Sequence, residues 1–230
     1  EVFDEKRYFS PGKGPGIFEI GDHKLALTVC EDIWHTKAVR QASRRGADLI
    51  LNLNASPFHL NKLKERKEMI SSHCQKYKLP IVYLNQVGGQ DELVFDGTSM
   101  IMDKHGQQVI QLKKFENESR IVKLKKSDES GLDILDSDNL QEENELEDIY
   151  KALVLGAKDY IEKNGFPGVL IGSSGGIDSA LTAAIATDAV GPDKVKTYMM
   201  PFKFTSDISV HDAEELAKNL KIEHHVLPIK

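Results

Sequence analysis

The sequence predicts an α/β protein in which a mixed sheet is followed by the opening of a doubly wound, Rossmann-like sheet. From Leu25 to Val109, short aliphatic runs alternate with segments of helical periodicity, and hairpin signals follow. Beyond residue 149, an amphipathic helix, a short strand, a glycine-rich turn and an alanine-rich helix succeed one another. Strands that alternate with helices favour a layered α/β architecture, and hairpins add antiparallel strands to the sheet.

The first part is expected to hold two strand–helix units in succession. Ala38, Ala42 and Arg45 recur at helical spacing, and Gly46 ends that helix. A second, longer polar helix ends before Pro80. Its basic stretch also carries glutamates, so we interpret that stretch as a solvated helix face. The predicted strands are residues 25–29, 48–54, 81–89 and 120–124, the predicted helices are residues 36–45 and 61–77, and a hairpin turns at residues 104–106.

An acidic segment separates the two parts. Between Lys125 and Asp148 the composition turns acidic and lacks a consistent apolar stripe, which is typical of a solvated linker. An acidic surface helix is an equally good interpretation of its second half. We therefore expect one domain over residues 1–126, a linker over 127–148 and a second domain over 149–230. The second domain is predicted to hold helices at residues 149–164, 177–190 and 210–220 and strands at 169–172, 195–201 and 223–229.

Composition and charge disfavour several classes of partner. With 40% hydrophobic and 29% charged residues, the chain has the composition of an ordinary folded protein. A formal net charge of −6 argues against a nucleic acid or an anionic membrane as its partner. No stretch approaches the roughly 18 to 20 uninterrupted apolar residues of a spanning helix. Cys30 and Cys74 are too few for a disulfide framework and suit the reducing cytoplasm.

A glycine-rich loop, Ser174-Gly175-Gly176-Ile177-Asp178-Ser179, lies between a predicted strand and a predicted helix. Glycines permit positive φ there, while free N–H groups and the helix dipole favour a bound anion. The Walker A pattern requires a lysine that this loop lacks, so a conventional phosphoryl-transfer NTPase is disfavoured. We assign Asp178 to a Mg²⁺ ion that bridges to phosphate oxygens. The alternative is an ordinary turn with Asp178 as a helix cap.

The loop and the segment after it resemble a known family. SGGIDS looks like the pyrophosphate loop of the ATP pyrophosphatases, which adenylate a carboxylate or carbonyl group. The following segment is similar to the glutamine-dependent NAD⁺ synthetases at Met200-Pro201, Thr205-Ser206, Ser209 and Asp212-Ala213.

Two departures from the family pattern accompany this resemblance. The family has Leu where Ser173 stands and Arg where Lys203 stands, so the contact of that Arg stays open at Lys203. The resemblance implies ATP and Mg²⁺ as cofactors, with Asp178 on the metal. It also implies ATP contacts by Gly172, Ser174, Gly175, Gly176, Ile177, Asp178 and Ser179.

Cys30 follows the predicted strand LALTV and precedes Glu31-Asp32-Ile33-Trp34. A thiol at a strand-to-helix turn faces a ligand, and the helix start lowers its pKa. A lone cysteine after an apolar run is more often a small core residue. CEDIW, NASPF and FDGTS resemble, in order and spacing, the nitrilase-type amidase domain of the same NAD⁺ synthetases. The resemblance thus implies part of an α-β-β-α sandwich before the nucleotide-binding domain.

The resemblance assigns roles residue by residue. Cys30 attacks the side-chain amide of glutamine, forms a thioester and releases ammonia, and Glu92 matches a family glutamate near this nucleophile. Glu92 is equally well interpreted as an exposed loop acid. The family's catalytic Glu and Lys match no residue of this sequence, and neither Lys6 nor Lys13 replaces them. Glutamine-binding roles fall on Glu31, Trp34, Ser56 and Lys62.

The expected activity is an ATP-dependent carbon–nitrogen ligase. Ammonia amidates ATP-activated deamido-NAD⁺, which gives NAD⁺, AMP, pyrophosphate and glutamate. A different acceptor, or a non-catalytic scaffold if the upstream Glu and Lys are absent, are the alternatives. The chain starts without Met, so we expect an internal fragment of a larger protein, working in the cytoplasm as a homo-oligomer.

Overall fold

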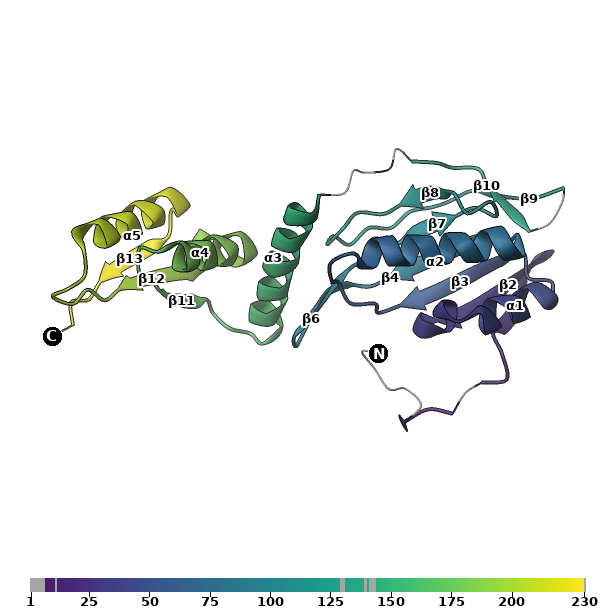
Figure 1. Ribbon diagram of the computed structural model, residues 1–230, viewed down its shortest axis with the longest axis horizontal. Coiled ribbons are helices and arrows are strands. Elements are labelled where there is room, and N and C mark those ends of the chain that lie inside the picture. The colour runs from purple at the N-terminus through teal and green to yellow at the C-terminus, as the bar shows by residue number, and fades with distance from the viewer. Residues whose placement is uncertain (1–6, 11, 129–130, 139, 141–143, 230) are drawn as a thin grey trace. The chain divides into compact units, whose positions relative to one another are not determined.

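The computed structural model describes the chain except for residues 1–6, 11, 129–130, 139, 141–143 and 230 (Figure 1). The chain divides into two compact units, which we call unit 1 and unit 2. Unit 1 comprises Glu1–Val87 and Asp96–Glu143, and unit 2 comprises Gly88–Phe95 and Asn144–Lys230. Unit 2 therefore takes one short segment from the middle of the chain, which the sequence pattern did not indicate.

Unit 1 is built on a six-stranded mixed sheet with the order β1-β2-β3-β4-β7-β8. The strands β2, β3 and β4 are parallel, while β1, β7 and β8 join antiparallel. The predicted α/β class with a mixed sheet is confirmed. The elements are β1 (Gly16–Ile20), β2 (His23–Val29), the 3-10 turn η2 (Cys30–Trp34), α1 (Thr36–Arg44), β3 (Leu49–Asn54), α2 (Lys62–Tyr77), β4 (Ile81–Asn85), β7 (Met100–Met102), β8 (Gln108–Gln111), β9 (Leu124–Lys126) and β10 (Leu132–Ile134).

Helices α1 and α2 cover one face of this sheet (Figure 1). Because side chains alternate along a strand, Ile50 and Ile81 point to the helices and pack with Val39 of α1 and Ile70 of α2. All four side chains are fully buried, and each such burial contributes about 1.5 to 3 kcal/mol. The buried stripe of α1 differs from the prediction, since Arg45 is exposed after the helix end.

Two strands of unit 1 differ from the sequence predictions. The single strand expected over residues 81–89 ends at Asn85, because Gly88 adopts a φ of +137° and the chain turns into a separate hairpin. The strand expected over residues 120–124 begins only at Leu124. Before it, side chains take part in the contacts: the Lys123 N–H donates to the Asp136 carboxylate at 2.7 Å, and the Arg120 side chain pairs with Asp138 at 2.6 Å.

The acidic segment is not solvated throughout. Residues Leu132–Ile134 form β10, which pairs antiparallel with β9. Leu132 is 2% exposed and packs with Leu25 and Leu49 on the sheet face opposite α1 and α2. An isolated apolar residue in an acidic run carries no periodicity, so composition alone predicted solvent there. The domain boundaries at residues 126 and 149 stay predictions.

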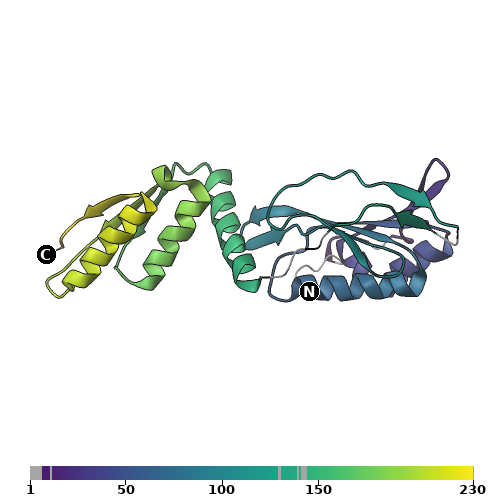
Figure 2. The ribbon, with the colours of Figure 1, turned by 90° about the horizontal axis from the view of Figure 1, so that it is seen from above.

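Unit 2 holds a three-stranded parallel sheet with the order β11-β12-β13. The helices α4 and α5 connect successive strands and cover the same face of the sheet (Figure 2), as two right-handed crossovers require. Ala183, Val195 and Ala217 form the centre of its core. The elements are α3 (Glu145–Lys163), β11 (Val169–Gly172), α4 (Ile177–Val190), the 3-10 turn η3 (Pro192–Lys194), β12 (Val195–Met199), α5 (Asp207–Leu220) and β13 (Glu223–Val226).

A hairpin of β5 (Val87–Gln90) and β6 (Leu93–Asp96) packs on α3. The N–H of Gly89 donates to Asp159 at 2.6 Å, and Lys163 donates to the carbonyl oxygen of Gly89 at 2.6 Å. A Cβ added at Gly89 would lie 3.2 Å from the Cα of Gly156. Two glycines facing each other therefore allow the backbones of hairpin and helix to approach closely.

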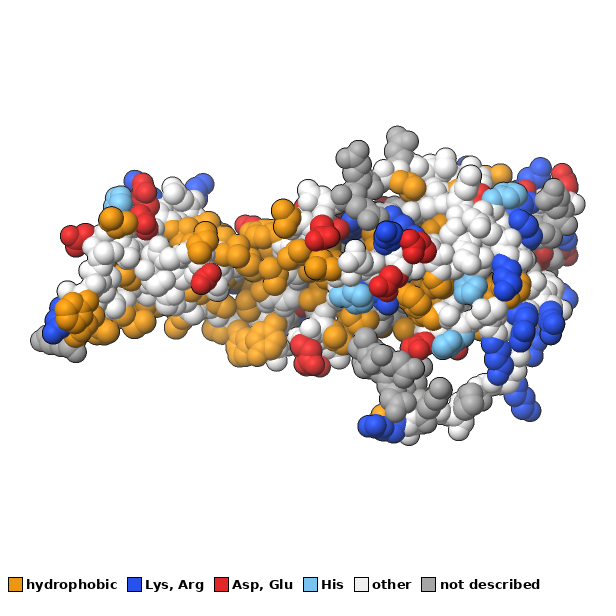
Figure 3. All heavy atoms as spheres, viewed as in Figure 1, with side chains coloured by type: hydrophobic (Ala, Val, Ile, Leu, Met, Phe, Trp, Pro, Cys, Tyr) orange, Lys and Arg blue, Asp and Glu red, His pale blue; other side chains and the backbone are white. Residues whose placement is uncertain are grey.

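Apolar side chains gather over the helices of unit 2 in the space-filling view (Figure 3). Despite them, no helix in the described part of the chain combines the length and the apolar character needed to cross a bilayer. The exposed large apolar side chains of these helices include Leu146, Leu153, Tyr160, Ile177 and Leu181.

His73 of α2 makes the stability of unit 1 depend on pH. Burial lowers the pKa of its imidazole, although its hydrogen bond to the Ile33 carbonyl opposes the shift. The unfolded chain then binds the proton more readily, so stability is complete above about pH 6.5 and is lost as the pH falls below it. We expect a slope of up to about 1.4 kcal/mol per pH unit from this group.

Urea denaturation between pH 5 and 7.5 measures this slope, and His73→Gln is the control because it removes the titrating group. Equal slopes for the two proteins would contradict the assignment.

Candidate active site

Three parallel strands bring the predicted thiol site to one edge of the unit 1 sheet. Because β2, β3 and β4 run in the same direction, their carboxyl ends at Val29, Asn54 and Asn85 meet there. Cys30 follows β2 and Ser56 follows β3. The structure therefore gathers residues that lie far apart in the sequence.

Cys30 begins the η2 turn with a left-handed φ of +44°. A non-glycine residue in this region is held there by its surroundings, and such positions cluster at functional sites. The fully buried Ile33 anchors the turn, and the N–H of Val29 donates to Asp32 at 3.0 Å. The thiol is thus presented, half-exposed, at a tightly fixed turn.

Lys62 and Trp34 meet beside this turn. The Nζ of Lys62 lies 4.1 Å from the centre of the Trp34 ring and 3.0 Å from Glu65. The indole face holds the ammonium group by a cation–π interaction, which leaves further N–H groups of Lys62 for an anion. Glu31 makes a looser contact. Its carboxylate lies 3.8 Å from the ring of His35, which is exposed.

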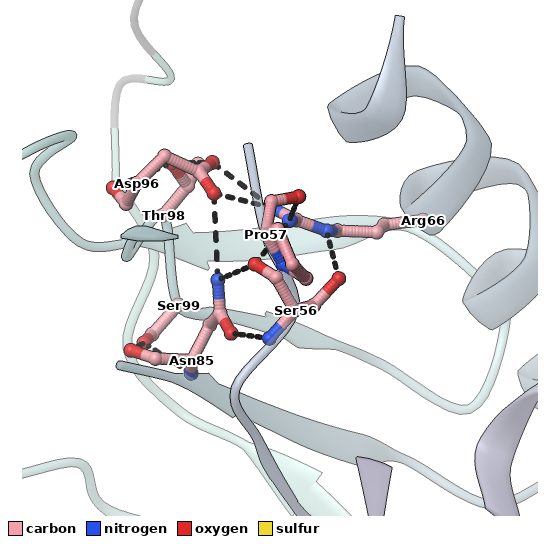
Figure 4. A network of polar contacts seen from close by, with 7 residues as sticks. All are labelled: Ser56, Pro57, Arg66, Asn85, Asp96, Thr98 and Ser99. Atoms are coloured by element: carbon pink, nitrogen blue, oxygen red, sulfur yellow. Dashed lines mark hydrogen bonds and ion pairs between the residues drawn. The ribbon is translucent and has the colours of Figure 1, made fainter. Parts of the chain in front are cut away.

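Ser56 is buried and is held mainly by Arg66 of α2 (Figure 4). The Nε of Arg66 donates to Ser56 Oγ at 3.2 Å, and one Nη donates to the backbone oxygens of Ser56 and Pro57 at 2.8 and 3.0 Å. The other Nη donates to both carboxylate oxygens of Asp96 at 2.9 Å. All five N–H groups of the guanidinium are therefore used.

Asn85 and Thr98 complete the network in Figure 4. Asn85 accepts from the Ser56 N–H at 2.8 Å and donates to the Ser56 carbonyl at 3.2 Å. Thr98 donates to Asp96 at 2.9 Å. The peptide group of Ser56 is consequently fixed from two sides.

The charges of both this network and the thiol influence the pKa of Tyr83. Its side chain is fully buried, and burial raises the pKa of its phenol. The Arg66 guanidinium opposes the rise in this pKa, while a charge on Cys30 adds to it.

Cys74 differs from Cys30 in its exposure, which is one of the properties that govern thiol reactivity. It is fully buried in the core of unit 1, and burial raises its pKa to about 12. Its interpretation as a structural residue agrees with this burial.

The predicted residue Glu92 is exposed in the turn between β5 and β6. That turn belongs to unit 2, whereas Cys30 belongs to unit 1. The catalytic role of Glu92 stays a prediction. The exposure of its side chain also agrees with the alternative interpretation as a loop acid.

The predicted phosphate loop lies between β11 and α4. Ser174 and Ser179 close it, with their Oγ atoms 3.1 Å apart, and Ser174 also accepts from the N–H of Gly176 at 3.2 Å. Gly175 has a φ of +76°, and a Cβ there would collide with the carbonyl oxygen of Ser209 in α5. Only glycine fits both the conformation and the space.

The loop opens toward solvent at the start of α4. Gly176 caps the helix without a side chain, so the first N–H groups face outward, as an anion site requires. Asp178 is exposed in the first turn, and its carboxylate oxygens suit a hard cation such as Mg²⁺. Gly172, just before the loop, and Ile177, within it, are both exposed. In the segment after β12, the Nζ of Lys203 lies 4.8 Å from the Phe204 ring centre.

Sequence reasoning missed Arg66, Asp96 and Asn85. Arg66 falls in the basic stretch that we interpreted as solvated, yet it is 0% exposed. A long cation on a polar helix carries no sign of burial, because its partner Asp96 is 30 residues away. The one available signal was spacing, since Arg66 lies one helical turn after Lys62.

Comparison with family models divides the chain into two matches. Residues 1–130 match the model described as carbon-nitrogen hydrolase. Residues 149–230 match the model described as NAD synthase. The two matches lie in the order that the motifs about Cys30 and Ser174 indicated.

The chain is similar over nearly its whole length to curated proteins. A glutamine-dependent NAD(+) synthetase of Acinetobacter baylyi is 42% identical over 228 residues, which cover 99% of this chain and 42% of the relative. That of Aquifex aeolicus is 42% identical over 258 residues, which cover 100% and 46%. The chain thus spans less than half the length of these relatives.

Solved structures agree. The glutamine-dependent NAD⁺ synthetase of Acinetobacter baumannii, solved in complex with ADP, superposes with a TM-score of 0.91 at 42% identity, covering 100% of this chain and 43% of that one. That of Cytophaga hutchinsonii has a TM-score of 0.75 at 18% identity, covering 97% and 44%, and supports the fold alone.

The two thiols should differ sharply in alkylation. At pH 8, a pKa of about 12 leaves only about one Cys74 in 10⁴ as thiolate, and the side chain is buried. We expect iodoacetamide to label Cys30 in the folded protein and to reach Cys74 only after unfolding in urea. Mass spectrometry of tryptic peptides measures this. Labelling of both thiols at equal rates in the folded protein would contradict the assignment of the buried core.

Proposed function

Because residues 1–130 make this chain a member of the carbon-nitrogen hydrolase family, we propose that Cys30 is the nucleophile that cleaves the side-chain amide of glutamine. One observation supports this most. The thiol sits at a left-handed turn on the same sheet edge as the buried Ser56 and the Lys62 ammonium group. Nucleophile and substrate-binding groups therefore converge from three segments of the chain.

The chemistry follows from the thiol. The sulfur of Cys30 attacks the amide carbon, the C–N bond breaks, and ammonia leaves with the thiol proton. The thioester that forms is hydrolysed by water to glutamate, which restores the thiol. The groups that accept the proton and stabilise the oxyanion correspond to the family Glu and Lys, which match no residue of this sequence.

The other end of glutamine needs an anion site and a cation site. Lys62 offers an ammonium group to the α-carboxylate, and Ser56 offers a hydroxyl. Trp34 holds Lys62 in place at 4.1 Å, and Glu31 suits the α-ammonium group. Glu92 is proposed to assist near the nucleophile.

Unit 2 is proposed to use the ammonia. The loop from Ser174 to Ser179, with Gly172 before it, binds the phosphates of ATP through backbone N–H groups. When bound at Asp178, Mg²⁺ supplies positive charge to the phosphate oxygens. The carboxylate of deamido-NAD⁺ is adenylated with release of pyrophosphate, and ammonia then displaces AMP to give NAD⁺. The likeness to NAD⁺ synthetases at 42% identity supports this acceptor.

Two alternatives remain distinct from this proposal. Another amidotransferase would share both sites and differ only in its acceptor, which a panel of acceptors separates by AMP release. A scaffold would lack both activities.

Both cysteines are thiols, which supports the reducing cytoplasm as the place where the enzyme works. We propose a homo-oligomer, and sedimentation tests it.

Cys30→Ala in the natural protein should separate the two nitrogen sources. It removes the thioester route but leaves the nucleotide loop intact, so NAD⁺ synthesis should be lost with glutamine and retained with ammonium salts. The rescue should improve as the pH rises toward the pKa of ammonium, because NH₃ is the nucleophile. NAD⁺ formed from each source is the measurement.

Cys74→Ala is the matched control, because it removes a thiol from the same unit. It deletes a buried sulfur, should cost about 1 to 2 kcal/mol of stability, and should leave glutamine use intact. Retained glutamine-dependent synthesis in Cys30→Ala would remove Cys30 from the catalytic assignment.

Asp178→Asn should abolish synthesis from both nitrogen sources. The substitution removes the negative charge that a bound Mg²⁺ needs but keeps the size of the side chain and its place in α4. Glutamine hydrolysis in unit 1 should continue. Steady-state NAD⁺ formation over a range of Mg²⁺ concentrations measures the effect, and near-normal synthesis would exclude the metal assignment.

A further inference from the structure

We propose that Arg66, together with its partner Asp96, is a positioning residue of the amide-cleaving site, where it holds the Ser56 hydroxyl in the orientation that glutamine requires. The inference rests on the proposed function of unit 1. It assigns a role to a residue that neither touches the reacting atoms nor lies on the exposed site surface.

The hydrogen bonds of Arg66 are divided between two targets. Three of its N–H groups go to the Ser56–Pro57 segment, at 3.2 Å to Ser56 Oγ and at 2.8 and 3.0 Å to the two backbone oxygens. The remaining two go to Asp96 at 2.9 Å. The guanidinium therefore ties α2 and the strand end at Asp96 to the loop after β3.

The charge of Arg66 is balanced inside the protein. Its side chain is 0% exposed and that of Asp96 is 5% exposed, and both Asp96 oxygens accept from it. A buried, fully paired cation does not compete with Lys62 for a substrate carboxylate. A buried ion pair is also weak evidence for stability, since an apolar pair of similar size is often as stable. Geometry, rather than charge or stability, is what this pair supplies.

The hydrogen bond between Arg66 and Ser56 has a fixed direction, which orients the Ser56 hydroxyl. A guanidinium only donates, so Ser56 Oγ must accept from Arg66. Its own hydrogen is then directed elsewhere, where an oxygen of a ligand can accept it. Asn85 holds the same residue through its backbone at 2.8 Å, so that the hydroxyl has little freedom to rotate away.

The helix α2 thus supplies two residues to the site, one at its surface and one in the interior. Lys62 reaches the site mouth, and Arg66, one turn later on the same side, acts from the interior through Ser56. If this is correct, removal of Arg66 weakens glutamine binding only as far as Ser56 takes part in it.

A double-mutant cycle in the natural protein tests this. Ser56→Ala, Arg66→Lys and the double variant are compared with wild type in KM and kcat for glutamine, with ammonia-dependent synthesis and the melting temperature measured for each. The Arg66→Lys substitution keeps the positive charge, but an ammonium group cannot supply five N–H groups. We expect each single variant to raise KM about tenfold, as loss of one hydrogen bond to a charged group does.

The double variant should also raise KM about tenfold, rather than about a hundredfold, because both changes remove the same interaction. The kcat with glutamine should change less than KM, and ammonia-dependent synthesis should be unchanged. Lys104→Met is the matched control. It breaks another ion pair, between the largely buried Lys104 side chain and the half-exposed Asp133 at 3.1 Å, but follows β7, whose pairing of Met102 with Ile81 places it at the opposite sheet edge. It should lower the melting temperature without raising KM.

Additive effects in the double variant, or a lower melting temperature with an unchanged KM in Arg66→Lys, would overturn the inference. Should Arg66→Lys not fold, Thr98→Ala serves instead, since it removes one hydrogen bond to Asp96 at 2.9 Å. A few-fold rise in KM supports the inference there, and an unchanged KM overturns it. A wild-type protein that cannot use glutamine at all would refute the proposed function itself.

Discussion

The buried contact between Arg66 and Asp96 is the interaction on which the arrangement of unit 1 depends. The guanidinium and the carboxylate come from segments 30 residues apart, and both are almost fully removed from water. Such a pair is tolerated only when every donor is satisfied, because an unpaired buried charge costs several kcal/mol. Satisfying the five donors dictates where the helix, the loop after β3 and the end of β6 must lie. The turn that carries Cys30 lies at the same edge of the sheet, where the carboxyl ends of β2, β3 and β4 meet.

A different constraint, close backbone contact, governs unit 2. Gly175 packs so closely on α5 that no side chain fits there, and Gly89 approaches Gly156 of α3 in the same way. These contacts let the loop expose its N–H groups and let a hairpin from the middle of the chain join α3. Unit 1 thus uses a satisfied polar network, and unit 2 uses the absence of side chains, to give a functional loop one conformation.

The two sites also differ in how far apart in the sequence their residues lie. The phosphate loop is a local structure, since the six residues from Ser174 to Ser179 run from just after β11 into the first turn of α4. The thiol site is assembled from residues that follow β2 and β3 and from the first turns of α2. Its parts are individually ordinary, and they become a site only where parallel strands end together.

Local periodicity predicted the α/β class. Short motifs and their resemblance to a known family indicated the two parts of the chain and the roles of Cys30 and the loop at Ser174, which stay predictions. Tertiary structure alone decided that Arg66 is buried and that Leu132 leaves solvent for the core. Tertiary structure also decided that the chain turns away after Asn85 to place a hairpin on α3. Each of these depends on a partner far away in the chain, and no local pattern carries the position of such a partner.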